Sequence, residues 1–408
     1  MLITETIQSP KRRRWQRTIA GVAALTLFAA ACGSDDAAEP ADDAAPETVA
    51  EDTETEAAEA VVEAEAPEAE APEEEAPEEE AMEEEAMANL DLDTNGDGTV
   101  QIGVATPGPR DDGAYYQALV EWVEDYSTAN GFADPIIVDN VDGAQAETEL
   151  RSLARQGVDV IAIGAGEISD PDTVAALTKE FEDIFWYCNC GASGQIEGVA
   201  QSADDGAEIS YSAGYATGLL LQETESTEAV FLGCCQLDFE SESANSFALG
   251  LAAVDPAFVS TYIPTGDFND IAGATEAFNQ AVSNGAGAVY PFLGGAHEAI
   301  AQLANESGVI TMSAGASDVC DRDDIDYQIA VQFDAGDYLD VIFEKIAAGE
   351  LNEGETFTFR VGAFDFVGAK FCGATDEQTA ALVAANATLA NGDLDGALFE
   401  IKAAAYGF

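Results

Sequence analysis

The chain has 408 residues, and its 79 Asp and Glu side chains outnumber its 14 Lys and Arg, which gives a formal net charge of −65. This excess of negative charge excludes nucleic acid as a partner, because binding to phosphates needs a cationic surface. It would also repel an anionic membrane surface, so any attachment to a membrane must come from a lipid or an apolar segment.

The first 31 residues have the layout of an export signal. The basic stretch KRRRWQR at 11–17 precedes the apolar run TIAGVAALTLFAAA at 18–31. That run is shorter than the roughly 20 residues that a membrane-spanning helix needs. A cleaved signal peptide is therefore favoured over a retained signal anchor.

The residues around Cys32 resemble a bacterial lipoprotein signal, in which small residues precede the cysteine at the cleavage site. Here Ala30 and Ala31 precede Cys32, and Gly33 follows it. The resemblance implies that residues 1–31 are removed and that the Cys32 sulfur carries a diacylglycerol with fatty acyl chains such as palmitate. The alternative is an ordinary secreted protein with an unpaired thiol.

An acidic segment follows. Removing residues 1–31 leaves 9 cations against 78 acids, a net charge of −69, and residues 35–86 alone hold 24 acids and no Lys or Arg. From Glu70 a five-residue repeat begins with EAPEE. Few apolar groups, high charge and regular proline cannot offset the entropy of ordering. We therefore predict a disordered, lipid-anchored tether over residues 32–98.

The end of this segment contains one candidate metal loop. DTNGDGTVQIGV, from Asp93, has the D-x-N-x-D-G start of an EF-hand-type calcium loop. Its twelfth position is Val104, where that loop needs a bidentate glutamate. An acidic turn is favoured over a weak calcium site, and the sequence leaves both open.

From residue 100, runs of β-branched residues alternate with amphipathic stretches of helical period, a pattern typical of βαβ units and a parallel sheet. In the first series we predict strands at 100–106, 135–140, 158–166 and 184–191 and helices at 115–131, 144–157, 172–183 and 211–222. In the second we predict strands at 229–235, 258–264, 286–295 and 309–315 and helices at 241–254, 274–285 and 297–308. A helix at 336–350 and strands at 356–364 and 365–371 follow.

Two similar series in about 300 residues predict two α/β lobes joined by a hinge, because so long a chain exceeds one small core. We assign residues 99–226 to the first lobe, with a returning helix near 334–350. Residues 227–332 form the second, with strands near 355–372. Residues 373–408 form a C-terminal segment.

Six cysteines besides Cys32 allow up to three disulfides outside the cytoplasm. We favour a bridge between Cys320 and Cys372, because both should lie near an edge of the second lobe. Adjacent cysteines rarely bond, because the small ring strains the peptide, so we expect Cys234 and Cys235 to stay apart. The cysteine spacings do not match a structural zinc site, and we expect no metal.

The sequence contains few of the residues and motifs that indicate catalysis. The chain has one histidine, His297, and lacks G-x-S-x-G, a P-loop and a G-x-G-x-x-G after its first strand. We therefore expect a receptor with no enzymatic activity and no cofactor. Two alternatives stay open, a ligand sensor coupled to a signalling partner and an exported enzyme with an unrecognised site.

Five motifs, in the same order, resemble the basic membrane protein family of lipoproteins. These proteins are substrate-binding subunits of ABC importers and include purine-nucleoside receptors. The motifs read DDGAYYQ from Asp111, QGVDVIAIGAG from Gln156, YSAGYATG from Tyr211, GDFND from Gly266 and GAGAVYPFLGG from Gly285. The resemblance implies a periplasmic-binding-protein type I fold, a small-molecule ligand in a cleft between two Rossmann-like lobes, and an ABC permease as partner at the outer face of the membrane.

The resemblance also implies candidate ligand-binding residues in the first lobe. Asp111 and Asp112 would accept hydrogen bonds from the ligand, or cap the following helix. Tyr115 stands where the family has an aromatic side chain that stacks on the ligand. Tyr116 beside it is a departure, because the family has an asparagine there. Arg110 would face an anionic or carbonyl group, or pair with Asp111 or Asp112.

In the second lobe, Tyr290 and Phe292 end a predicted strand, where open α/β sheets bind their ligands. Facing aromatic rings favour a ring-bearing solute. We expect a small, neutral, polar one, with nucleosides first and sugars second. The chain departs from the family at Gly315, where an aspartate is usual, and at Gln332, where a lysine is usual.

Overall fold

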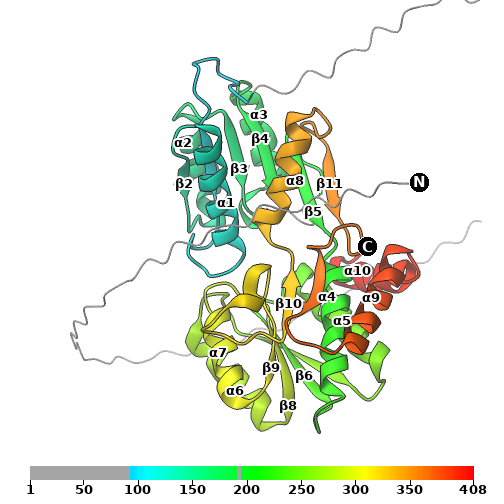
Figure 1. Ribbon diagram of the computed structural model, residues 1–408. Helices are drawn as coiled ribbons and strands as arrows, with labels where there is room; N and C mark the ends of the chain where they lie inside the picture. The colour runs from blue at the N-terminus through cyan, green and yellow to red at the C-terminus, as the bar shows by residue number, and fades with distance from the viewer. Residues whose placement is uncertain (1–91, 191–193) are drawn as a thin grey trace, which may run out of the picture. The chain divides into compact units, whose positions relative to one another are not determined.

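The computed structural model describes residues 92–190 and 194–408, which all fall in one compact unit (Figure 1). The expected signal peptide, Cys32 and residues 32–91 of the expected tether lie outside the described residues. Within the described ranges, no helix is long and apolar enough to cross a bilayer.

The first lobe is built on a six-stranded sheet in which all neighbouring strands are parallel. β1, β3 and β4 are buried along their whole length, as strands covered on both faces should be. In spatial order the strands are β11 (Thr356–Phe359), β5 (Ala200–Asp204), β4 (Phe185–Asn189), β3 (Val160–Ile163), β1 (Ile102–Ala105) and β2 (Ile136–Val138). Helices α1 (Tyr115–Asn130), α2 (Ala146–Ala154) and α3 (Pro171–Glu180) belong to this lobe.

The second lobe has a parallel four-stranded sheet with its own apolar core. Its order is β7 (Val259–Pro264), β6 (Glu228–Gly233), β8 (Ala286–Pro291) and β9 (Ile310–Thr311). Its helices are α5 (Asp238–Val254), α6 (Ile271–Ser283) and α7 (His297–Ser307).

Three segments connect the lobes. The chain crosses first through α4 (Gly206–Leu221), then between β10 (Ile329–Gln332) and α8 (Ala335–Ala347), and last between β11 and β12 (Gly368–Phe371). β10 pairs antiparallel with β12, and a bridge from Met312 to Ile329 joins β10 to the second sheet. α8 packs against α1, where the Trp122 indole donates a hydrogen bond to Asp340.

Two boundaries differ from the sequence-based expectation. The strand at 356–359 does not close the second lobe, because β11 pairs with β5 in the first sheet. The first lobe begins before residue 99, because Leu92 is buried and Thr94 Oγ1 donates a hydrogen bond to the Asp159 carbonyl over 3.1 Å. In the loop from Asp93, that carboxylate accepts hydrogen bonds from the backbone of Asp97 and Gly98, so the loop forms an acidic turn.

Helices α4 and α5 pack with their backbones in close contact at two glycines. A Cβ atom on Gly214 would overlap the carbonyl of Phe247, and one on Gly250 would overlap the carbonyl of Tyr211. Only glycine allows backbones to approach so closely. The C-terminal segment adds α9 (Asp376–Ala390) and α10 (Asp395–Tyr406), which pack on α4 and α5 beside it (Figure 1).

All six described cysteines are bridged. Cys320 and Cys372 form a disulfide with Cα atoms 4.9 Å apart, in the pairing favoured from the sequence. Cys188 bonds Cys190 at the end of β4. Cys234 bonds Cys235, so the expectation that these adjacent thiols stay apart is wrong. They lie in the turn after β6, where Glu240 accepts the backbone N–H groups of both residues and fixes them together.

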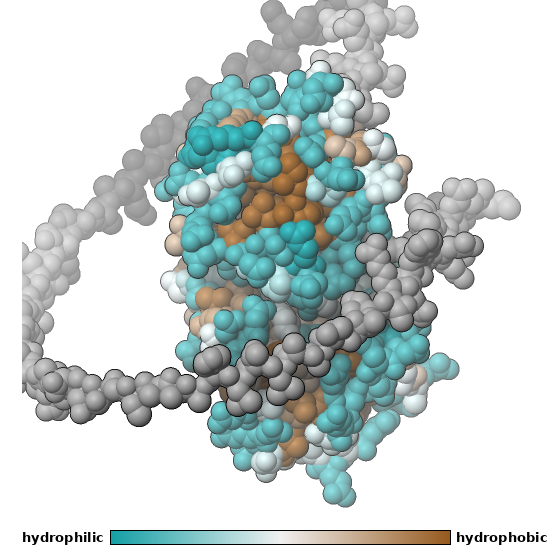
Figure 2. All heavy atoms as spheres, turned by 90° about the vertical axis from the view of Figure 1, so that its left-hand side faces the viewer, coloured by the Kyte–Doolittle hydropathy of each residue, from teal (hydrophilic) through white to brown (hydrophobic). Residues whose placement is uncertain are grey.

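Figure 2 shows that hydrophilic side chains cover most of the visible face of the described residues, interrupted by apolar areas. This distribution agrees with the large acidic excess of the sequence. Charged side chains of one sign need contact with water and counterions, which a surface provides.

Candidate functional site

The candidate site lies where the carboxyl ends of strands from both lobes meet. A series of contacts between aromatic rings runs through it. The ring centroid of Tyr115, at the start of α1, lies 6.2 Å from that of Phe333, which follows β10. The centroid of Phe333 lies 6.0 Å from that of Phe292, which follows β8. Tyr115 comes from the first lobe and Phe292 from the second. The rings therefore connect the two lobes through the crossover strand.

The start of α1 shows how the first lobe positions its aromatic pair. Asp112 is buried and accepts hydrogen bonds from the backbone N–H groups of Ala114 at 2.9 Å and Gln117 at 3.0 Å. Asp112 thus caps the helix, which is one of the two roles expected of it. Asp111 is exposed. Asp112 also accepts a hydrogen bond from the Tyr116 backbone at 3.3 Å, so it lies beside the aromatic pair.

Tyr115 and Tyr116 contact each other edge to face, with centroids 5.6 Å apart. The Tyr116 ring fills the space beside Gly108, where a Cβ atom would lie 2.6 Å from it. Burial raises the pKa of both phenols well above the usual value, and the nearby carboxylate of Glu167 adds to the rise. Both hydroxyls therefore stay neutral at physiological pH, as hydrogen-bonding groups.

Arg110 is held by a residue that follows β2. Its guanidinium pairs with Asp139 through Nε at 3.0 Å and Nη2 at 3.1 Å, and Nη2 also donates to the Ile137 carbonyl at 2.9 Å. The expectation that it pairs with Asp111 or Asp112 is wrong. A carboxylate at the end of β2, 29 residues along the chain, provides a better bidentate geometry.

In the second lobe, Tyr290 and Phe292 lie with their ring centroids 5.6 Å apart. Tyr290 is fully buried, and its hydroxyl has no hydrogen-bond partner among the described residues. His297 holds the turn that follows: Nδ1 lies 2.8 Å from the Pro291 carbonyl and Nε2 3.1 Å from the Tyr327 hydroxyl. The one histidine of the chain is thus a structural residue, and burial lowers its pKa.

Phe333 is a site residue that the sequence motifs do not single out. Its ring explains the departure at Gly315, which has a φ of +85° and whose Cβ atom would lie 2.9 Å from that ring. Gln332 is buried and pairs with Gly368 in the β10–β12 ladder. At the positions where the resemblance places an acid and a lysine, this chain has a glycine beside an aromatic ring and a neutral amide.

Asp204 is a second site residue that the sequence does not reveal. It ends β5, and its Oδ2 accepts a hydrogen bond from the Tyr338 hydroxyl at 3.3 Å. Burial raises the pKa of Asp204 to about 6, with further contributions from the negative charges of Asp205 and Glu242. Burial raises the pKa values of Tyr115 and Tyr290, and the negative charge of Asp204 adds to the rise.

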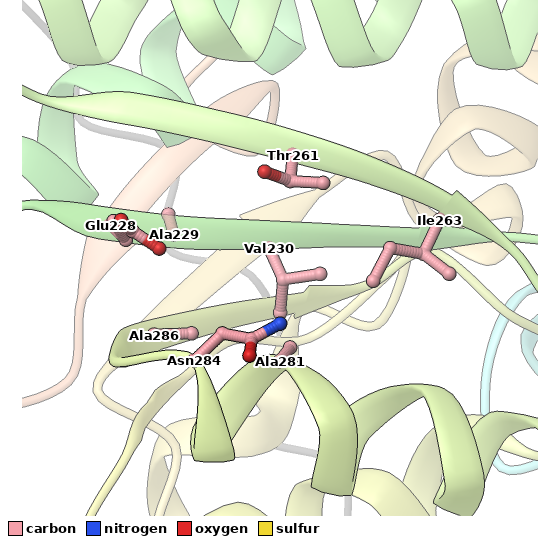
Figure 3. A pocket seen from close by; sticks show the side chains of 8 residues that line it. All are labelled: Glu228, Ala229, Val230, Thr261, Ile263, Ala281, Asn284 and Ala286. Atoms are coloured by element: carbon pink, nitrogen blue, oxygen red, sulfur yellow. The ribbon is translucent and has the colours of Figure 1, made fainter.

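A small pocket elsewhere does not compete with this region. Figure 3 shows it beside the first residues of β6 and β8. Its volume is about 60 Å³. Its lining includes Glu228, Val230, Ile263 and Asn284. It lies at the amino-terminal end of the sheet and has room for only a few water molecules.

Comparison with known proteins decides the family. Residues 99–365 match a family described as ABC transporter substrate-binding protein PnrA-like, the Bmp family. The chain belongs to the Bmp family. Bmp proteins are solute-binding proteins, and substrate-binding proteins of ABC importers work outside the cytoplasm. A comparison with curated proteins found no match.

Solved structures agree on the fold. An ABC transporter solute-binding protein from Conexibacter woesei is 21% identical, with a TM-score of 0.56 over 72% of this chain and 98% of the other. One from Aeropyrum pernix is 14% identical, with a TM-score of 0.57 over 76% and 92%. This Bmp protein therefore has the expected periplasmic-binding-protein type I fold.

Proposed function

We propose that this Bmp protein captures a small, polar, ring-bearing solute between its two lobes and delivers it to an ABC permease. The observation that carries the proposal is the series of rings from Tyr115 through Phe333 to Phe292, which joins one lobe to the other. Aromatic side chains at the carboxyl ends of parallel strands lie where α/β sheets bind ligands. Stacking on such rings contributes on the order of 1 kcal/mol per ring beyond the burial of area.

Nucleosides are the first candidates and sugars the second. Both have a ring face that can stack on Tyr115 or Phe292 and polar groups that can bond to the buried phenols. Membership of a PnrA-like family supports the first choice. The chain has Gln332 and Gly315 where the family usually has a lysine and an acid, so its solute meets neither of those charges.

We further propose that Cys32 carries the lipid that holds the protein at the outer face of the membrane. The acidic segment that follows it would then act as the tether between the lipid and the first lobe. A long negatively charged linker extends by self-repulsion, so it would let the protein reach its permease.

The test is a calorimetric titration of the purified protein with nucleosides and sugars. We expect one of these solutes to bind and the Tyr115→Ala variant to bind it at least tenfold more weakly, with little change in melting temperature. Phe399→Ala is the matched control, because Phe399 is an exposed aromatic of α10 outside the ring series. Equal affinities of wild type and Tyr115→Ala would contradict the proposal, as would binding of a linear anion alone.

A further inference from the structure

The disulfide between Cys234 and Cys235 lies at the edge of the second sheet where α/β folds bind their ligands. The two residues directly follow β6, and the neighbouring strand β8 ends just before Phe292. β6 and β8 are parallel, so their carboxyl ends lie at the same edge. The disulfide is therefore on the side of the second lobe that carries the aromatic rings, and solute capture as proposed above assigns it no role.

This disulfide differs from the other two in its access to solvent. Cys234 is fully buried, but Cys235 is exposed, and it is the only exposed cysteine among the six that the structure describes. The bridge at the end of β4 is buried at both cysteines, and the bridge to the end of β12 is half-buried at both. Thiol–disulfide exchange needs a thiolate to reach a sulfur atom, so access favours the bridge between Cys234 and Cys235.

The turn that contains this disulfide is held by one carboxylate. Glu240 is fully buried and accepts the backbone N–H groups of both cysteines. It also accepts the Leu237 N–H at 2.9 Å and the Tyr262 hydroxyl at 3.1 Å. Gln236 has a φ of +57°, which a non-glycine residue keeps only where its surroundings hold it. The disulfide and Glu240 together therefore fix the backbone of residues 234–237.

The same turn positions aromatic side chains of the candidate site. The ring centroid of Phe239, in the first turn of α5, lies 6.3 Å from that of Phe292 and 6.5 Å from that of Phe268. Phe268 belongs to the GDFND turn, and the Cys235 sulfur lies 3.8 Å from the carbonyl oxygen of Gly266 in that turn. The disulfide thus contacts the turn that carries one of these rings and precedes the helix start that carries another.

We propose that the bridge between Cys234 and Cys235 is a site of thiol–disulfide exchange with an extracytoplasmic dithiol, and that its reduction releases the turn that positions Phe239 beside Phe292. A thiolate of the dithiol attacks the exposed Cys235 sulfur, the bond between the two cysteine sulfurs breaks, and Cys234 leaves as a thiolate that takes up a proton. The second thiol of the dithiol loses its proton, attacks the mixed disulfide and releases Cys235. The dithiol is oxidised to a cyclic disulfide, and the protein gains two thiols.

Reduction changes the turn because it opens the ring that joins the two adjacent residues. The peptide group between Cys234 and Cys235 can then rotate, and their N–H groups no longer have to point together at Glu240. Phe239 lies next to Glu240 in the sequence, so its position beside Phe292 becomes less well defined. This effect does not depend on which solute binds.

The experiment measures the reduction of all three bridges in one protein. Purified protein is treated with dithiothreitol at pH 7.5 for increasing times, free thiols are blocked with N-ethylmaleimide, and the labelled peptides are quantified by mass spectrometry. We expect Cys234 and Cys235 to be labelled at least tenfold faster than the cysteines of the other two bridges, because only Cys235 is exposed. Labelling no faster than at the other bridges, or free thiols at Cys234 and Cys235 before reductant is added, would overturn the proposal.

Hydrogen–deuterium exchange then tests the effect on the turn. With only this bridge reduced, we expect exchange to rise at least tenfold in residues 234–240 and 265–269 and to stay unchanged in the first lobe. Cys234→Ser/Cys235→Ser should show the same pattern without reductant, and the reduced wild type decides the matter if that variant does not fold. Cys320→Ser/Cys372→Ser is the matched control and should leave exchange in 234–240 unchanged. Unchanged exchange in 234–240 after reduction, or an equal rise in both lobes, would contradict the proposal.

Discussion

Asp204 shows how the burial of a single carboxylate can lower stability. Its pKa is raised from 3.8 to about 6 in the folded protein, chiefly by burial. Between these two values the folded state holds more protons than the unfolded state, so the free energy of unfolding decreases as the pH rises. Above about pH 6 the full penalty is present.

We therefore expect Asp204→Asn to increase the free energy of unfolding by about 1–3 kcal/mol at pH 7.5, because a shift of one pKa unit is worth about 1.4 kcal/mol. Chemical denaturation at pH 7.5 and pH 4 measures the effect, which should largely disappear at the lower pH. Asp205→Asn should instead decrease stability, because Asp205 caps α4 and pairs with Lys402. A less stable Asp204→Asn variant at pH 7.5 would show that this carboxylate is structurally required.

Asp204 also shows which site residues could not be predicted from the sequence. Tyr115 and Phe292 could be selected from motifs, because their neighbours resemble a family pattern. Asp204 could not, because AQSAD at 200–204 lacks the β-branched residues that indicate a strand. The pairing of Arg110 with Asp139 could not be predicted from neighbouring residues either, because the pairing of β1 with β2 brings the two side chains together.

At the scale of elements, the contact between α4 and α5 holds the crossover helix in place. We expect Gly214→Ala to lower the free energy of unfolding by about 2–3 kcal/mol, because the added methyl group overlaps the Phe247 carbonyl and forces the helices apart. Gly206→Ala in the same helix is the control, since its Cβ atom would meet nothing closer than 3.7 Å. Urea denaturation of both variants checks this, and equal stability would contradict the close contact.

In the helices and buried strands, apolar residues recur with the period of the element, so the positions of most elements in both lobes could be predicted from the sequence. The pattern predicts a helix at 115–131, and α1 spans Tyr115–Asn130. The placement of late strands could not be predicted, because pairing partners are set by tertiary contacts. β11 has the alternating sequence TFTF, which is compatible with either sheet, and its place beside β5 depends on the return of the chain through α8.

At the scale of the whole molecule, the proposed attachment to the membrane depends on one atom, the sulfur of Cys32. Cys32→Ala should release the protein into the soluble fraction, because the sulfur that would carry the lipid is gone and the acidic surface repels anionic lipids. Cell fractionation with a carbonate wash measures this, with Cys32→Ser as a second variant. A Cys32→Ala protein that stays in the membrane pellet would show that the apolar run at 18–31 is the anchor.

The central claim is that a ring-bearing solute binds between the lobes on the series of rings. Mass spectrometry of small molecules released by denaturing the purified protein tests it most directly, with wild type compared with the double variant Tyr115→Ala/Phe292→Ala and with Phe399→Ala. We predict a ring-bearing solute in wild type and Phe399→Ala that is absent from the double variant. A solute present in equal amounts in all three proteins, or one without a ring, would contradict the account.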